Sequence, residues 1–238
     1  MQCLGVKERG CYRLPSSTIW KLFPVTLKTY THSPFSGKKP ASMAILLHGL
    51  GANGADLIDL ARYWERALPD TVFVSPDAPF PCDMAPYGFQ WFSLQDRAPE
   101  SMLRGAKEAE PVLNEYINEM LQKYEIADEK LALIGFSQGT MMSLYAGPRR
   151  AKAIAGVLGY SGALLGAESL ATEGKHKIPV HLVHGDMDSV VPLQAYHMAK
   201  AALEENGFPV TGGVSRGLAH SIDEDGIESG AEFLTEIL

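Results

Sequence analysis

Short, mostly hydrophobic runs recur along the chain, and each ends at a glycine, proline, serine or aspartate. The runs consist mainly of valine, isoleucine, leucine and alanine, a composition typical of strands buried on both faces of a sheet. They cover residues 43–49, 71–77, 131–136, 153–161 and 180–186, with a weaker run at 210–215. We expect these segments to be strands of one sheet.

The stretches between these runs place hydrophobic residues three and four positions apart, with charged residues between them. This period predicts amphipathic helices, over residues 54–68, 105–124, 138–149, 193–206 and 227–238. Strands that alternate with helices form a mostly parallel central sheet with helices on both faces, so the expected fold class is α/β. Binding sites in such sheets lie beyond the carboxyl ends of the strands.

Residues 76–99 follow a predicted strand and interrupt this rhythm. The segment contains five prolines and five aromatic residues and has no periodicity. A loop of this length inside a compact domain is usually functional or mobile. Because it follows a strand, we expect it to lie over the functional edge of the sheet.

Length and composition favour one globular domain. The chain has 238 residues, of which 46% are hydrophobic and 21% charged, enough to bury a single core. We assign residues 41–238 to this domain. Residues 1–40 are interpreted as an extension without fixed order, a strand added at the sheet edge, or residues foreign to the protein.

Charge and cysteine content narrow the range of partners. The formal net charge is −7 and basic residues do not cluster, which argues against nucleic acid and anionic membrane surfaces as partners. The uncharged run 153–167 is too short for a membrane span, so no stable membrane insertion is expected. Cys3, Cys11 and Cys82 have neither metal-site nor disulfide-framework spacing. Together with the absence of a secretory signal pattern at the amino terminus, they favour a reducing cytoplasm.

The sequence Gly135-Phe136-Ser137-Gln138-Gly139 lies where a predicted strand becomes a helix. A serine at a helix start is usually a capping residue, but capping does not explain glycines two positions to either side. A G-x-S-x-G turn between strand and helix holds the serine in a strained conformation with its hydroxyl exposed. Ser137 is therefore the candidate nucleophile, and the Gln138 N–H the candidate donor to an oxyanion.

A serine nucleophile needs a general base and an acid that orients it, which follow it along the chain in this fold type. His220 lies in a loop between the last strand-like run and the final helix, so it is the candidate base. Asp186 ends the strand-like run 180–186 and Asp188 lies two residues beyond it, and we favour Asp188 as the acid and Asp186 as a structural cap. Structural roles are expected for three other downstream histidines, His181, His184 and His197.

The segment 46–54, LLHGLGANG, is the candidate for the second oxyanion donor. Gly49, Gly51 and Gly54 allow the backbone after a strand to turn its N–H groups toward the site. The segment lacks the lysine and glycine spacing of a phosphate-binding loop. We expect the ring of His48 to stabilise this loop.

Taken together, LLHGLGANG, SPDAP, FQWF, LIGFSQG, YSG, HGDMDSVVP and GLAHSI resemble, in this order, motifs of the bacterial carboxylesterase, lysophospholipase and acyl-protein thioesterase family of α/β-hydrolases. The resemblance covers about residues 42–238. It implies a triad of Ser137, Asp188 and His220, which selects Asp188 over Asp186, and oxyanion donors at the Leu50 and Gln138 N–H groups. It also implies a compact core without a large lid domain, no cofactor or metal, and often a homodimer.

The same resemblance makes Trp91 and Phe92 candidates for contact with the acyl group. The alternative is that these rings only anchor their loop. Ser93 stands where many thioesterases carry an acidic residue, so we expect a serine carboxylesterase that hydrolyses small esters with short to medium acyl chains through an acyl-enzyme. The alternatives are a lysophospholipase or acyl-protein thioesterase and, in another class, a catalytically silent binding module with a hydrolase fold.

Overall fold

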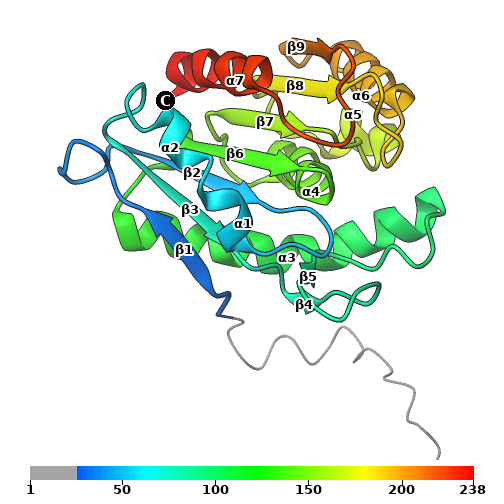
Figure 1. Ribbon diagram of the computed structural model, residues 1–238, viewed down its shortest axis with the longest axis horizontal. Helices are drawn as coiled ribbons and strands as arrows, with labels where there is room; N and C mark the ends of the chain where they lie inside the picture. The colour runs from blue at the N-terminus through cyan, green and yellow to red at the C-terminus, as the bar shows by residue number, and fades with distance from the viewer. Residues whose placement is uncertain (1–25) are drawn as a thin grey trace, which may run out of the picture.

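A seven-stranded sheet forms the centre of the computed structural model, which describes residues 26–238 (Figure 1). Its spatial order is β1-β3-β2-β6-β7-β8-β9. β1 is antiparallel to β3, and all other neighbouring strands are parallel. The strands are β1 Thr29–His32, β2 Ser42–Leu47, β3 Thr71–Pro76, β6 Leu131–Phe136, β7 Gly156–Tyr160, β8 Val180–Gly185 and β9 Val210–Ser215.

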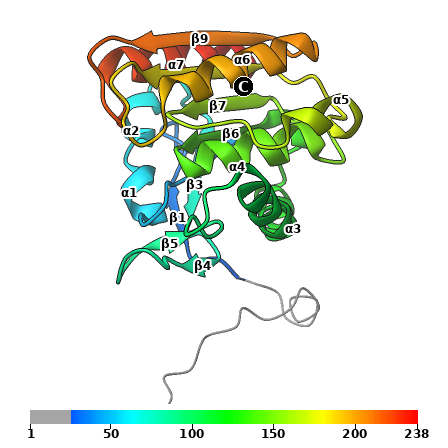
Figure 2. The ribbon, with the colours of Figure 1, turned by 90° about the vertical axis from the view of Figure 1, so that its right-hand side faces the viewer.

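Helices cover both faces of this sheet and bury a hydrophobic core on each (Figure 2). One core contains residues of α3 Pro99–Tyr124, α4 Gln138–Ala146, α5 Leu170–Glu173 and α6 Leu193–Glu205. The other contains residues of α1 Gly54–Ile58, α2 Ala61–Trp64 and α7 Glu224–Ile237. Every residue of β2, β3, β7 and β8 is buried, as expected for strands covered on both sides. The α/β fold class is confirmed.

Two predicted helices depart most from their expected limits, whereas α4 only ends three residues earlier than expected and α7 begins three residues earlier. The helix expected over residues 54–68 is split into α1 and α2, and α3 begins at Pro99 instead of residue 105. Pro99 occupies the first helical turn, where the missing N–H of proline is harmless and its fixed φ favours the helix. Proline therefore marks the start of α3 and not the end of a loop.

Residues 76–99 contain a small hairpin of β4 Phe80–Pro81 and β5 Phe89–Gln90. This hairpin lies against the loop after β2: Gly51 N–H donates to Phe89 O at 2.9 Å, and Phe89 N–H donates to Ala52 O at 2.8 Å. The segment thus holds the loop at the carboxyl end of β2 in place.

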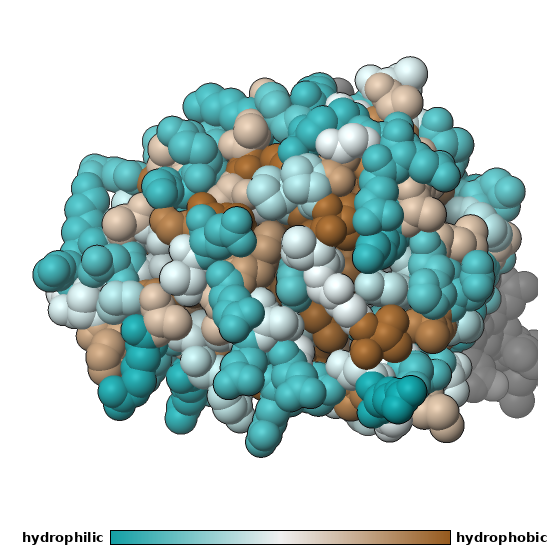
Figure 3. All heavy atoms as spheres, turned by 90° about the horizontal axis from the view of Figure 1, so that it is seen from above, coloured by the Kyte–Doolittle hydropathy of each residue, from teal (hydrophilic) through white to brown (hydrophobic). Residues whose placement is uncertain are grey.

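The range 1–40 contains the edge strand β1, which Thr29 links to α3 through a 3.1 Å hydrogen bond to the Tyr116 hydroxyl. The alternatives that concern residues 1–25 lie outside the described residues, and the division at residue 40 stays a prediction. Figure 3 views the face over α7 and β9, where hydrophilic side chains predominate around smaller hydrophobic patches. In residues 26–238, no helix is long and apolar enough to cross a membrane.

Candidate active site

Ser137 lies in a sharp turn between β6 and α4. Its backbone has φ 54° and ψ −114°, a left-handed region that a residue with a Cβ adopts only at an energetic cost. Its side chain makes no capping hydrogen bond to α4, so the ordinary capping role is excluded. The strained serine, whose hydroxyl has no hydrogen-bond partner among the described residues, has the geometry expected of a nucleophile elbow.

The two glycines that flank Ser137 lie where no side chain fits. A Cβ on Gly135 would lie 2.4 Å from the Thr140 nitrogen, and one on Gly139 would lie 1.8 Å from the Leu47 carbonyl oxygen. The first glycine lets α4 fold back on β6, and the second lets α4 approach the end of β2. The G-x-S-x-G pattern is therefore a packing requirement of this turn.

Asp188 and His220 meet beyond the end of β8. His220 Nδ1 is 2.7 Å from Asp188 Oδ2, while Asp188 Oδ1 accepts the backbone N–H groups of Val190 at 2.8 Å and Val191 at 2.9 Å. Burial acts to raise the pKa of Asp188, but these hydrogen bonds outweigh it and hold the pKa below its usual value. The carboxylate, whose side chain is 0% exposed, is therefore ionised and fixed toward His220.

Asp186 is exposed and has a different role from the one expected. Its carboxylate accepts the Gly217 N–H at 2.6 Å, and α6 has Pro192 at its N-cap position without a side-chain cap. The prediction that Asp186 acts as a cap is wrong. It instead fastens the loop that leads from β9 to His220.

Hydrogen bonds at the end of β7 bring the His220 loop beside Ser137. The Ser137 N–H donates to Tyr160 O at 2.9 Å, and the next residue, Ser161, donates its hydroxyl to Ser221 O at 3.3 Å. The rings of Phe136 and His220 lie 4.9 Å apart. Because Asp188 occupies Nδ1 of His220, Nε2 remains for the serine. The Ser137 hydroxyl and His220 are not hydrogen-bonded to each other in this state, and catalytic hydrogen bonds often tighten only when substrate binds.

The loop after β2 reaches the serine from the other side. A Cβ on Gly49 would lie 3.3 Å from Ser137 Cβ, so the backbone of this loop borders the nucleophile. Within the part of the chain that the structure describes, neither the Leu50 N–H nor the Gln138 N–H donates a hydrogen bond. Two unpaired backbone donors beside a serine can bind an oxyanion.

His48 stabilises this loop, as its sequence position predicts. Its Nδ1 donates to Gly49 O at 2.7 Å and its Nε2 accepts the Ala78 N–H at 2.9 Å, which fixes the neutral tautomer. Burial lowers the pKa of His48. Both nitrogens are thus engaged in structure and neither faces a substrate.

Of the three other histidines for which structural roles are expected, His181 and His184 have structural surroundings, whereas His197 lies at the surface. His184 Nε2 donates to Val191 O at 2.8 Å and lies 3.4 Å from Asp188 Oδ2, which steadies the loop that carries this aspartate. His181 is hydrogen-bonded to side-chain hydroxyls of Thr211 and Ser229, and His197 is exposed. Sequence reasoning missed the support that His184 gives to Asp188, although its HGxxD spacing offered a signal.

Trp91 and Phe92 are buried, with exposed fractions of 0% and 3%. The Trp91 Nε1–H donates to His48 O at 3.0 Å. The loop-anchoring alternative accounts for both rings as they stand, and their contact with an acyl group stays a prediction.

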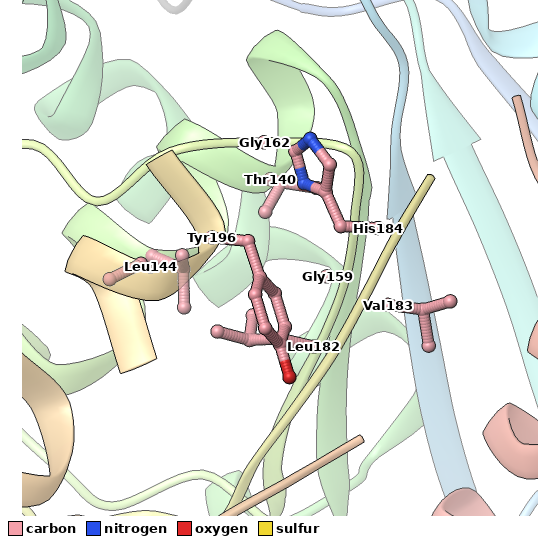
Figure 4. A pocket seen from close by; sticks show the side chains of 9 residues that line it. Thr140, Leu144, Gly159, Gly162, Leu182, Val183, His184 and Tyr196 are labelled. Atoms are coloured by element: carbon pink, nitrogen blue, oxygen red, sulfur yellow. The ribbon is translucent and has the colours of Figure 1, made fainter. Parts of the chain in front are cut away.

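Figure 4 shows a small cavity lined by residues of α4, β7, β8 and α6, among them Thr140, His184 and Tyr196. Its volume of about 10 Å³ is near that needed for one water molecule, so it cannot hold an ester. No group of three or more histidine, cysteine, aspartate or glutamate side chains within residues 26–238 is arranged to hold a metal ion.

Comparison with known proteins places this geometry in a family. The phospholipase/carboxylesterase family model matches residues 34–238. The chain belongs to this family. It is 30% identical to esterase YpfH of Escherichia coli over 84% of each chain, and 33% identical to acyl-protein thioesterase 1 of Kluyveromyces lactis over 85% of this chain and 95% of that protein.

The solved structure of esterase PE8 is 36% identical to this chain and superposes on it with a TM-score of 0.86. The match covers 90% of this chain and 100% of the PE8 chain. The family membership confirms the α/β-hydrolase fold and makes the protein a hydrolase of the serine-hydrolase superfamily. The resemblance drawn from the sequence motifs is confirmed.

Proposed function

We propose that the protein is a carboxylesterase that uses Ser137 as nucleophile, His220 as general base and Asp188 as the acid that orients the base. The observation that carries the proposal is the 2.7 Å hydrogen bond between His220 Nδ1 and the buried Asp188 carboxylate, in a loop held beside the strained Ser137. This bond fixes the imidazole tautomer that can accept a proton at Nε2.

The proposed reaction has two halves. Ser137 Oγ attacks the ester carbonyl carbon while His220 Nε2 takes the hydroxyl proton, and the negative oxygen is bound by the N–H groups of Leu50 and Gln138. His220 then returns the proton to the leaving alcohol, and an acyl-enzyme remains. Water, deprotonated by His220, attacks the acyl carbon and releases the acid and Ser137.

The proposed substrates are small esters with short to medium acyl chains. Ser93, which is neutral beside the aromatic pair, supports an esterase over a thioesterase, and relatives named esterase and acyl-protein thioesterase are both similar to this chain. Preference for long acyl chains would favour the lysophospholipase or thioesterase alternative. A cytoplasmic location and a homodimer belong to the same proposal, and light scattering of the purified protein tests the dimer.

The test compares Ser137→Ala with Ser143→Ala on nitrophenyl esters of increasing acyl length. Ser143 is a matched control because it is buried in α4 and donates to Gly139 O. Ser137→Ala should lose nearly all turnover and all labelling by a fluorophosphonate probe, while Ser143→Ala keeps both. Turnover retained by Ser137→Ala would reject the proposal, and a wild-type protein that neither turns over esters nor reacts with the probe would favour the silent binding module.

A further inference from the structure

The backbone on both sides of Leu50 is held by hydrogen bonds from the segment 89–91. The Trp91 indole N–H donates to His48 O at 3.0 Å, and the Gly51 N–H donates to Phe89 O at 2.9 Å. The Leu50 N–H between them has no hydrogen-bond partner among the described residues. Its direction is therefore set by the anchored residues on either side.

The same tryptophan is attached to the second unpaired donor. The Gln138 side chain accepts the Trp91 N–H through Oε1 at 2.9 Å and donates through Nε2 to Phe92 O at 2.8 Å. Gln138 and Trp91 are both 0% exposed, so water does not compete for these bonds. One continuous bridge runs from Gln138 through Trp91 to the His48 carbonyl.

We propose that Trp91 is a positioning residue that sets the distance between the two oxyanion donors. Leu50 follows β2 and Gln138 follows β6, so no short covalent connection fixes the separation of their N–H groups. The Trp91 bridge supplies that connection through hydrogen bonds to both segments. Donors aimed in advance at the developing charge stabilise a transition state without reorganising. This inference rests on the proposed function and names the residue that arranges its oxyanion site.

The position of Trp91 predicts a specific kinetic effect. Removing the indole N–H leaves the buried His48 carbonyl without its partner and frees the loop that carries Leu50. Outright loss of one oxyanion donor lowers kcat about 10²- to 10³-fold, so loss of a donor's support should lower it roughly 10-fold. KM should stay within about twofold of wild type because the ground-state ester carries no full negative charge.

Trp64 offers a matched control on the other face of the sheet. It too is 0% exposed, and its indole N–H donates to a backbone carbonyl, Ile227 O, at 3.0 Å. Trp91→Phe and Trp64→Phe therefore delete the same kind of buried hydrogen bond and keep an aromatic ring. A purely structural contribution would affect both variants alike.

The experiment measures kcat, KM and the urea unfolding midpoint for both variants. It also measures their affinity for an aliphatic trifluoromethyl ketone, because the adduct of this inhibitor with the serine carries an oxyanion. Trp91→Phe should lose kcat and inhibitor affinity by similar factors, whereas Trp64→Phe should keep both within about twofold. Equal losses in the two variants, or wild-type kcat in Trp91→Phe, would overturn the inference.

A second variant, Gln138→Met, removes the side-chain hydrogen bonds and keeps the backbone N–H. It should lower kcat as Trp91→Phe does, and the double variant should lose less than the product of the two effects because both break one bridge. Multiplicative losses would contradict a shared bridge. Ser137→Ala separates the two proposals: if it is inactive while Trp91→Phe is normal, only the positioning role fails.

Discussion

Substituting Gly139 by alanine tests the packing of the nucleophile turn most directly. The added Cβ would lie 1.8 Å from Leu47 O and 2.9 Å from His48 O. Ordinary contact begins at 3.4 Å, so the start of α4 and the end of β2 must separate by about 1.6 Å, the difference between 3.4 and 1.8 Å. Both neighbours are backbone atoms and cannot rotate away. We expect a loss of about 3 kcal/mol in unfolding free energy, at the upper end of overpacking costs.

The same displacement should reduce activity, because Leu47 leads into the loop that carries Leu50. A misplacement of about 1 Å in a catalytic site can cost roughly 10²-fold in rate, and we expect a kcat loss of that order. Urea unfolding and ester kinetics measure the two effects. Gly213→Ala is the control, since a Cβ there meets nothing within 4 Å. Stability within about 0.5 kcal/mol of wild type and unchanged kcat in Gly139→Ala would refute the steric argument.

Three further perturbations test the acid, a buried histidine and a buried ion pair. Asp188→Asn should lower kcat about 10⁴-fold in a folded protein, whereas the kcat of Asp186→Asn should stay within about threefold of wild type. Equal losses of kcat in the two variants would contradict the assignment of Asp188 as the acid. Burial lowers the pKa of His181 from 6.5, so the unfolded chain binds the proton more readily and stability should fall as pH drops below 6.5. The difference between the urea unfolding midpoints at pH 7.5 and about 5.5 should be smaller in His181→Gln than in wild type. The same difference in both proteins would refute a contribution of His181 to the pH dependence of stability. Arg150→Met removes the buried guanidinium that lies 2.8 Å from the partly buried Asp128 carboxylate and leaves this carboxylate only the exposed Lys152 ammonium, 3.4 Å away. It should cost about 3 kcal/mol of unfolding free energy while activity per folded molecule stays normal; a loss below about 1 kcal/mol would count against the pair.

The sequence predicts the inner strands of the central sheet well because these strands are buried on both faces. A run such as residues 131–136 can satisfy its hydrophobic side chains and its backbone at once only inside a parallel sheet, and β6 spans the same residues. The turn around Ser137 is equally local. Its two glycines are required by contacts with β2 and α4, so the five-residue pattern alone predicts a tight, strained turn.

Features that depend on distant contacts could not be predicted in this way. The hairpin of β4 and β5 is too short to show a hydrophobic period, and its backbone is hydrogen-bonded to the loop after β2, which is distant in the sequence. The bridge from Gln138 to Trp91 joins residues 47 positions apart through a side-chain amide and a backbone N–H. No local pattern specifies such a pair, so the sequence predicts for Trp91 only acyl contact or anchoring of its own loop, and not a hydrogen bond to Gln138.

The two aspartates after β8 are alike in the sequence but differ in their surroundings in the fold. Both accept backbone N–H groups, as aspartates in turns commonly do. Asp188 accepts two from its own turn, which orients its other oxygen toward His220, whereas the exposed Asp186 reaches across to the neighbouring loop at Gly217. The residue type and the turn are visible in the sequence, but burial distinguishes the two carboxylates. A buried carboxylate whose free oxygen faces an imidazole can stabilise the imidazolium that forms during proton transfer, and an exposed one, screened by water, contributes far less.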